Sequence, residues 1–290
     1  MFKGTYTAIV TPFGTNNEVD HEKLRELVNF QIEEGIDGIV PCGTTGESPT
    51  LTMDEHEAVV RTVIEEVGGK VQVIAGTGSN NTAEAVHLTK KAAEFGADGA
   101  LVIMPYYNKP MPEGQFQHFK KVAEEGGIPV VLYNVPGRTG KSIEPEDVAR
   151  MYEEIEGVVA LKDAVGDMEY TCKVRSLCDI DILSGEDSMN YPIIAVGGKG
   201  AISVASNVVP GRVSEMITDA NNGNYEKARE QHFRLWGLFK VLFIETNPIP
   251  VKTALEIMGK IDGNLRLPLS DMEEKNRQAL ERVLAGLDLV

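Results

Sequence analysis

Lys162 is the residue of this sequence best suited to covalent chemistry. It ends the apolar run Val158-Val159-Ala160-Leu161, and a short valine-rich run of this kind, bounded by glycines, is typical of a buried strand. Lysine is seldom buried without a partner, so the side chain either reaches solvent from the strand end or faces a functional pocket. In a pocket, desolvation disfavours the ammonium form and leaves an amine that can act as a nucleophile.

Eight short apolar segments alternate with helical patterns along most of the chain. They cover residues 6–12, 38–42, 71–75, 100–104, 129–132, 158–162, 181–185 and 201–206, and most begin about thirty residues after the one before. This is the spacing of βα units, and near-continuous apolar strands indicate a parallel sheet that is covered on both faces. Eight such units in 290 residues predict a (β/α)8 TIM barrel. A doubly wound open sheet is the alternative, but the first segment ends in Thr11-Pro12 instead of a glycine-rich phosphate turn.

The sequence after Gly223 has helical patterns and no further strand pattern. A long helical stretch covers residues 225–245 and contains the only tryptophan, Trp236, and two more helical patterns follow. We therefore expect residues 1–223 to form the catalytic barrel and residues 224–290 to form an all-helical C-terminal domain. The segment 247–252 is interpreted as a structural turn between helices.

The active site of such a barrel lies at the carboxyl ends of its strands, so the residues that follow each strand are the candidates. They are Thr44, Thr45, Gly76, Thr77, Gly78, Tyr106, Tyr107, Tyr133, Arg138, Lys162, Gly185, Ile202 and Ser203. Only one lysine belongs to this set, and its hydroxyl, glycine and arginine neighbours favour a functional role for it over a solvent-reaching strand end.

Together these residue types suit Schiff-base chemistry. An uncharged lysine amine attacks a keto group, and the resulting iminium withdraws electrons from an adjacent carbanion. Tyrosine and threonine hydroxyls can carry the protons that this requires. Backbone N–H groups around glycine-flanked threonines can hold one carboxylate, and Arg138 can clamp a second.

Composition restricts the class of partner. The formal net charge is -16, which argues against nucleic acid and anionic membranes, although a local pocket can still bind a small anion. No apolar run approaches the ~20 residues that cross a bilayer, and the N-terminus does not resemble a signal peptide. Three cysteines among 290 residues fit a reducing cytoplasm without a disulfide framework.

Motifs for other chemistries are incomplete. Gly76-Thr77-Gly78 lacks the third glycine of a dinucleotide fingerprint, and Gly140-Lys141-Ser142 lacks the upstream glycine of a phosphate loop. The five histidines are scattered, so we expect no metal site and place the histidines on helix surfaces.

Three stretches carry a resemblance that covers nearly the whole chain. Gly43-Thr44-Thr45-Gly46-Glu47, the segment Tyr133–Gly140 and the lysine within Ala160–Ala164 resemble the dihydrodipicolinate synthase family, which belongs with N-acetylneuraminate lyase among the class I pyruvate aldolases. The resemblance implies condensation of pyruvate with L-aspartate 4-semialdehyde to 4-hydroxy-tetrahydrodipicolinate, in diaminopimelate and lysine biosynthesis. It also implies a homotetramer, built as a dimer of tight dimers, in the cytoplasm.

The same resemblance selects eight of these candidates as site residues and implies a role for each. Lys162 would form the Schiff base with pyruvate, with no other cofactor, and Tyr133 would donate and accept protons. Thr44 would link Tyr133 to Tyr107 of a neighbouring subunit. The substrate-binding residues implied are Thr45 for the pyruvate carboxylate, Arg138 for the carboxylate of aspartate semialdehyde, and Gly185 and Ile202 as lining of the pyruvate pocket.

Two other activities stay open on this scaffold. Sugar-acid aldolases of the N-acetylneuraminate lyase type share the lysine and the tyrosine, but they generally lack an arginine at the place of Arg138, which favours the amino-acid pathway. A barrel that binds pyruvate without catalysis is the second alternative.

Lysine feedback is expected to be weak or absent. The residues that match the effector pocket of lysine-inhibited members are Ser48, His56, Asn80, Glu84 and Tyr106. However, Pro49 and Met53 replace a small residue and a histidine, and Met53 cannot donate the hydrogen bond that an imidazole would.

Overall fold

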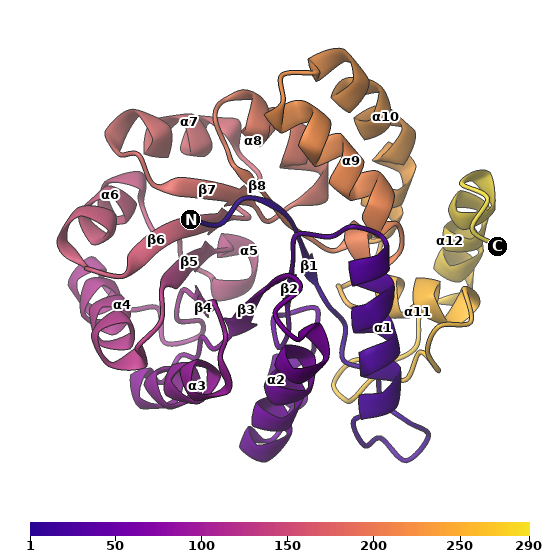
Figure 1. Cartoon of the computed structure of the whole chain (residues 1–290), viewed down its shortest axis with the longest axis horizontal. Helices are drawn as coiled ribbons and strands as arrows, with labels where there is room; N and C mark the ends of the chain where they lie inside the picture. The colour runs from indigo at the N-terminus through magenta and orange to yellow at the C-terminus, as the bar shows by residue number, and fades with distance from the viewer.

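The computed structural model describes all residues from 1 to 290 and contains one closed barrel of eight parallel strands. The strands are β1 (Gly4–Ala8), β2 (Gly38–Val40), β3 (Gln72–Gly76), β4 (Gly99–Ile103), β5 (Val130–Asn134), β6 (Val158–Asp163), β7 (Asp181–Ser184) and β8 (Gly200–Ser203). Each strand pairs with the next in the chain and β1 pairs with β8, so the predicted (β/α)8 barrel is confirmed. Figure 1 shows the helices as a ring around the strands.

Side-chain alternation along the strands separates two packed layers. One set of residues fills the barrel interior, and the residues between them face the surrounding helices. The interior set is Phe2, Tyr6, Ala8, Val40, Ile74, Leu101, Val131, Tyr133, Ala160, Leu183 and Ile202. A filled interior leaves space only at the strand ends, which is where a site can form.

The helices that surround the barrel begin largely where the sequence indicates. Asp20, Thr52 and Asn81 each accept a hydrogen bond from the first turn of the following helix, and Thr52 and Glu55 form a capping box. The helices are α1 (His21–Glu33), α2 (Met53–Val67), α3 (Thr82–Phe95), α4 (Pro112–Gly126), α5 (Pro136–Thr139), α6 (Pro145–Glu154), α7 (Met168–Leu177), α8 (Asn190–Ala195) and α9 (Pro210–Asn221).

The C-terminal region consists of α10 (Tyr225–Val241), α11 (Ile249–Ile257) and α12 (Glu274–Gly286). Helix α10 packs on α9, and α12 packs on both α10 and α11. Figure 1 shows this region, coloured orange to yellow, at the side of the barrel where α1 and α9 lie. The division of the chain into domains at residue 223 stays a prediction.

Candidate active site

Lys162 points into the barrel. It lies two residues after Ala160 on β6, and Ala160 belongs to the interior set, whereas the intervening Leu161 packs against the outer helices. The whole residue is only 6% exposed, so it is not a lysine that reaches solvent from a strand end. No carboxylate lies within ion-pair distance of its Nζ.

Tyr133 contacts Lys162 inside the barrel. The two residues are register partners on the paired strands β5 and β6, so both side chains face the interior. Lys162 Nζ lies 4.3 Å from the centre of the Tyr133 ring, and Tyr133 is 6% exposed. The paired strands therefore hold an amine and a phenol side by side in a site that is nearly closed to solvent.

Thr44 and Thr45 stand on a tightly bonded loop after β2. The N–H groups of Gly46 and Glu47 donate to the carbonyls of Gly43 and Thr44, each at 3.1 Å. A Cβ atom at Gly46 would lie 3.1 Å from Cys42 N, so glycine allows this close turn. Thr45 is buried, and Thr44 is half-buried.

Arg138 lies on the short helix α5, which follows β5, and its side chain is exposed. Its Nη2 donates a hydrogen bond to the backbone carbonyl of Asn247 at 3.1 Å. An exposed guanidinium at the edge of a buried site is well placed to meet a carboxylate that enters from solvent.

One cavity of about 80 Å³ joins these residues. Its lining is Thr44, Thr45, Tyr133, Val135, Arg138, Lys162, Ala164, Gly185, Glu186, Val204, Phe243 and Asn247. Gly185 is needed there, because a Cβ at this position would come within 2.9 Å of Lys162 Cε. Six of the eight predicted site residues thus meet around one small space.

Tyr107 and Ile202 do not line this cavity. Ile202 is buried in the barrel interior. Tyr107 is 89% exposed and has a left-handed φ of 69° in the loop after β4, so within one chain its phenol is directed to solvent.

Asn247 and Phe243 are cavity residues that the sequence analysis missed. Asn247 Nδ2 donates to Thr45 Oγ1 at 3.0 Å, so the interpretation of segment 247–252 as only a structural turn is wrong. Asn247 lies 202 positions from Thr45, and no local spacing could join them. The sequence signal that could have indicated a role for Asn247 was a polar residue next to Pro248 between two helical patterns.

A second cavity of about 60 Å³ shares two lining residues, Thr44 and Tyr133, with the first. Ser48, Pro49 and Tyr106 from the predicted effector segment line it, together with Cys42, Gly43, Gly76, Gly78, Leu101 and Ile103. His56 is turned into the fold, where its Nε2 lies 2.8 Å from the Gly76 carbonyl oxygen. Met53 is 37% exposed and does not line the cavity.

Three of the five histidines lie in the core, so the expectation that they occupy helix surfaces is wrong for His56, His118 and His232. Burial lowers the pKa of all three, and the pKa of His118 falls to about 4. Each lies on the helix face that packs inward, a property that composition alone does not reveal.

The protein has neither a metal-binding cluster nor a membrane-crossing helix. No group of three or more His, Cys, Asp or Glu side chains is arranged to hold a metal ion. No helix has both the length and the apolar character that a membrane crossing demands.

Known proteins with the same pattern identify the family. A model of the Dihydrodipicolinate synthetase family matches residues 1–287. The chain belongs to this family. It is 51% identical to the 4-hydroxy-tetrahydrodipicolinate synthase of Citrifermentans bemidjiense and 52% identical to that of Methanocaldococcus jannaschii, in each case over the full length of both chains. The crystal structure of dihydrodipicolinate synthase from Aquifex aeolicus is 47% identical and superposes with a TM-score of 0.98 over 99% of each chain.

Proposed function

We propose that this chain condenses pyruvate with L-aspartate 4-semialdehyde through a Schiff base on Lys162, to give 4-hydroxy-tetrahydrodipicolinate in the diaminopimelate route to lysine. The full-length identity to synthases of that name supports the reaction. The observation that carries the proposal is the unpaired, buried Lys162 beside Tyr133 in a cavity whose mouth holds Arg138.

The neutral amine of Lys162 is the form that attacks the keto carbon of pyruvate. The nitrogen bonds to that carbon, and the keto oxygen takes up protons and leaves as water. Loss of a methyl proton from the resulting iminium gives an enamine, and the enamine carbon then bonds to the aldehyde carbon of the second substrate. The aldehyde C=O bond opens in this step, its oxygen takes up a proton to become a hydroxyl group, and the enamine returns to an iminium. The amino group of that substrate can displace Lys162 and close the ring.

Tyr133 is the proposed proton donor and acceptor for these steps, because its ring contacts the Lys162 amine. Thr44 lines the same cavity and would relay protons away from it. The third member of the relay is Tyr107. Its 89% exposure supports a role in a neighbouring subunit rather than in its own barrel.

The two substrate carboxylates would lie at opposite ends of the cavity. Thr45, with its buried hydroxyl and its loop amide, is the proposed site for the pyruvate carboxylate, and Gly185 leaves space for pyruvate next to Lys162. Ile202 would support the floor of this pocket from the barrel interior. Arg138 is the proposed clamp for the carboxylate of aspartate semialdehyde.

We also infer a cytoplasmic homotetramer, a dimer of dimers, that needs no cofactor beyond the covalent pyruvate. The proposed contribution of Tyr107 to a neighbouring subunit requires at least a dimer, and the odd number of cysteines fits a reducing compartment. Lysine feedback should be weak or absent, because Met53 offers no hydrogen-bond donor. Sedimentation velocity and steady-state inhibition by lysine test the two statements separately.

The direct test of the reaction is a substrate panel with purified protein. Turnover of pyruvate with aspartate semialdehyde, and little turnover of sialic or keto-deoxy sugar acids, is the expected result. The reverse preference would assign the chain to the sugar-acid aldolases, and a pyruvate adduct without any turnover would favour a binding protein.

A further inference from the structure

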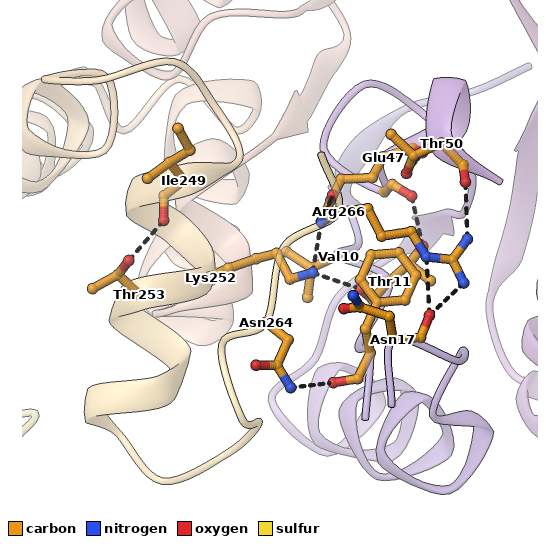
Figure 2. Close-up of polar contacts among 12 residues, drawn as sticks. Val10, Thr11, Asn17, Glu47, Thr50, Ile249, Lys252, Thr253, Asn264 and Arg266 are labelled. Carbon is orange, nitrogen blue, oxygen red and sulfur yellow. Dashed lines mark hydrogen bonds and ion pairs between the residues drawn. The ribbon is translucent and has the colours of Figure 1, made fainter. Parts of the chain in front are cut away.

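A fully buried ion pair joins the active-site loop to the C-terminal region. Lys252 Nζ lies 2.6 Å from Glu47 Oε1, and both side chains are 0% exposed. Glu47 ends the loop that carries Thr44 and Thr45, and Lys252 lies in the first half of α11. Figure 2 shows the Lys252 side chain extending from α11 toward this loop.

Every charged atom of this pair has a defined partner. Lys252 Nζ also donates to the Thr11 carbonyl at 3.0 Å and lies 4.2 Å from the centre of the Phe13 ring. The second carboxylate oxygen of Glu47 accepts from Arg266 N at 3.2 Å. The pair is therefore held in one geometry by contacts from two other parts of the chain, the segment after β1 and Arg266 (Figure 2).

The backbone of Glu47 shows that the loop depends on such contacts. Its φ of 53° and ψ of 35° are left-handed, a conformation that residues other than glycine, asparagine and aspartate rarely adopt. A residue stays in this conformation only when its surroundings impose it, and here the surroundings are Lys252 and Arg266.

The same two segments meet again inside the catalytic cavity. Asn247, five residues before Lys252, donates a hydrogen bond to the Thr45 hydroxyl at 3.0 Å. The backbone N–H of Lys252 donates a hydrogen bond to the carbonyl oxygen of Pro248 at 3.0 Å. The loop is thus tied to the α11 segment at two points, one in the core and one next to the proposed carboxylate site.

We propose that the Glu47–Lys252 pair is a positioning device that holds the Thr45 hydroxyl and amide in the orientation that binds the substrate carboxylate. The inference rests on the proposed pyruvate site at Thr45. Stability alone does not account for the pair, because well-packed apolar side chains commonly replace buried ion pairs without loss of stability. What an ion pair adds is a fixed distance and direction between two segments.

The test compares pyruvate saturation in two double variants. Glu47→Gln with Lys252→Met removes both charges and leaves no uncompensated ion. Arg277→Met with Glu256→Gln removes an ion pair of 2.8 Å in the same C-terminal region, away from the cavity lining. The positioning role predicts that pyruvate KM rises about tenfold in the first variant, the size expected for one misplaced hydrogen bond, while kcat changes by less than about threefold. The control should keep its pyruvate KM within about twofold.

A purely structural role would lower the active fraction, and hence kcat, at an unchanged pyruvate KM, and that result would overturn the inference. Borohydride trapping of pyruvate on wild-type Lys162 is measured alongside. If the wild type traps no pyruvate, the proposed function fails together with the inference. If the wild type traps pyruvate and the pyruvate KM of the Glu47→Gln, Lys252→Met variant is unchanged, only the inference fails.

Glu47→Asp gives a second test that does not depend on the folding of the neutral pair. Aspartate keeps the charge and tolerates the left-handed backbone, but it withdraws the carboxylate by one methylene from Lys252. A severalfold rise in pyruvate KM at nearly constant kcat is expected, and a pyruvate KM equal to that of the wild type would contradict the positioning role.

Discussion

Two buried lysines in this barrel have opposite surroundings. Lys252 is fully buried against the Glu47 carboxylate, a backbone carbonyl and an aromatic ring. Lys162 is almost as deeply buried, but its neighbours are the Tyr133 ring and a cavity. The same side chain is therefore held as a fixed ion in one place and left free to react in the other.

Under the proposed mechanism, the difference means that burial by itself does not mark a catalytic lysine. Desolvation lowers the pKa of Lys252, whereas the charge of Glu47 acts in the opposite direction and keeps the ammonium paired. Lys162 has no such counter-charge, and its nitrogen faces space that a substrate can enter. The partner and the adjacent cavity decide the role.

Lys162→Met should have the largest effect on activity. Methionine is unbranched and of similar length, so it fills the site but offers no nucleophile. We expect kcat to fall by about 10⁴-fold or more, as when other covalent nucleophiles are removed. A coupled steady-state assay measures this, and thermal unfolding should show a variant at least as stable as the wild type. Activity within tenfold of the wild type would remove Lys162 from the mechanism.

Lys252→Met, the same change at the other lysine, should lower stability, in addition to the rise in pyruvate KM expected when the Glu47–Lys252 pair is lost. It leaves the Glu47 carboxylate buried without its partner, and breaking a buried pair in this way costs about 3–5 kcal/mol. Urea unfolding monitored by circular dichroism measures the loss, and adding Glu47→Gln should restore most of it. An unchanged unfolding midpoint in the single variant would show that the pair is not the buried, charged contact described here.

Arg138→Ala should change the KM of one substrate more than the other. Loss of charge-assisted hydrogen bonds worth about 1.5–3 kcal/mol predicts a rise of about 10- to 100-fold in the KM of aspartate semialdehyde. The KM of pyruvate should stay within about threefold, because that carboxylate is assigned to Thr45. Equal increases for both substrates would move Arg138 out of the semialdehyde site.

Glu55→Gln should have the smallest effect and tests the outer part of the Lys252 network. A side-chain hydrogen bond from Arg266 lowers the pKa of Glu55 from 4.5 to about 2. A folded-state pKa below the unfolded value stabilises the protein above about pH 4.5, and this contribution is lost as pH falls toward about 2.

Because the Glu55 and Arg266 side chains are 29% and 15% exposed, solvent partly screens the pair, and the variant should lose about 1 kcal/mol at pH 7. The difference in free energy of unfolding between wild type and variant, measured by urea unfolding, should be smaller at pH 3 than at pH 7. A difference in unfolding free energy that is the same at pH 3 and pH 7 would contradict the lowered pKa of Glu55.

The sequence was sufficient to predict the barrel and most of the cavity residues at the carboxyl ends of its strands. Strand alternation and the spacing of βα units are local signals, so the sequence itself predicts the strands. Parallel strands bring their carboxyl ends to one edge of the barrel, so the positions of Lys162, Tyr133, Thr45 and Arg138 after their strands are enough to bring these residues together. The first and last strands were predicted too long, at residues 6–12 and 201–206, because the chain turns away after Ala8 and Ser203. Runs of apolar residues do not show where pairing stops.

Contacts between distant segments could not be predicted in the same way. Asn247 reaches Thr45, and Lys252 reaches Glu47, across about 200 positions of sequence, so no periodicity connects them. A partial signal was present, because Lys252 lies in the apolar sequence Val251–Leu255, just as Lys162 ends an apolar strand. An apolar surrounding indicates burial for either lysine, but it does not identify the carboxylate that Lys252 meets.

Borohydride reduction in the presence of pyruvate, followed by peptide mass spectrometry, tests the central distinction most directly. The cavity beside Lys162 predicts one covalent adduct, on the peptide that contains Lys162, and an unmodified Lys252 peptide. An adduct on Lys252, or none on either lysine, would contradict the assignment of Lys162 as the nucleophile.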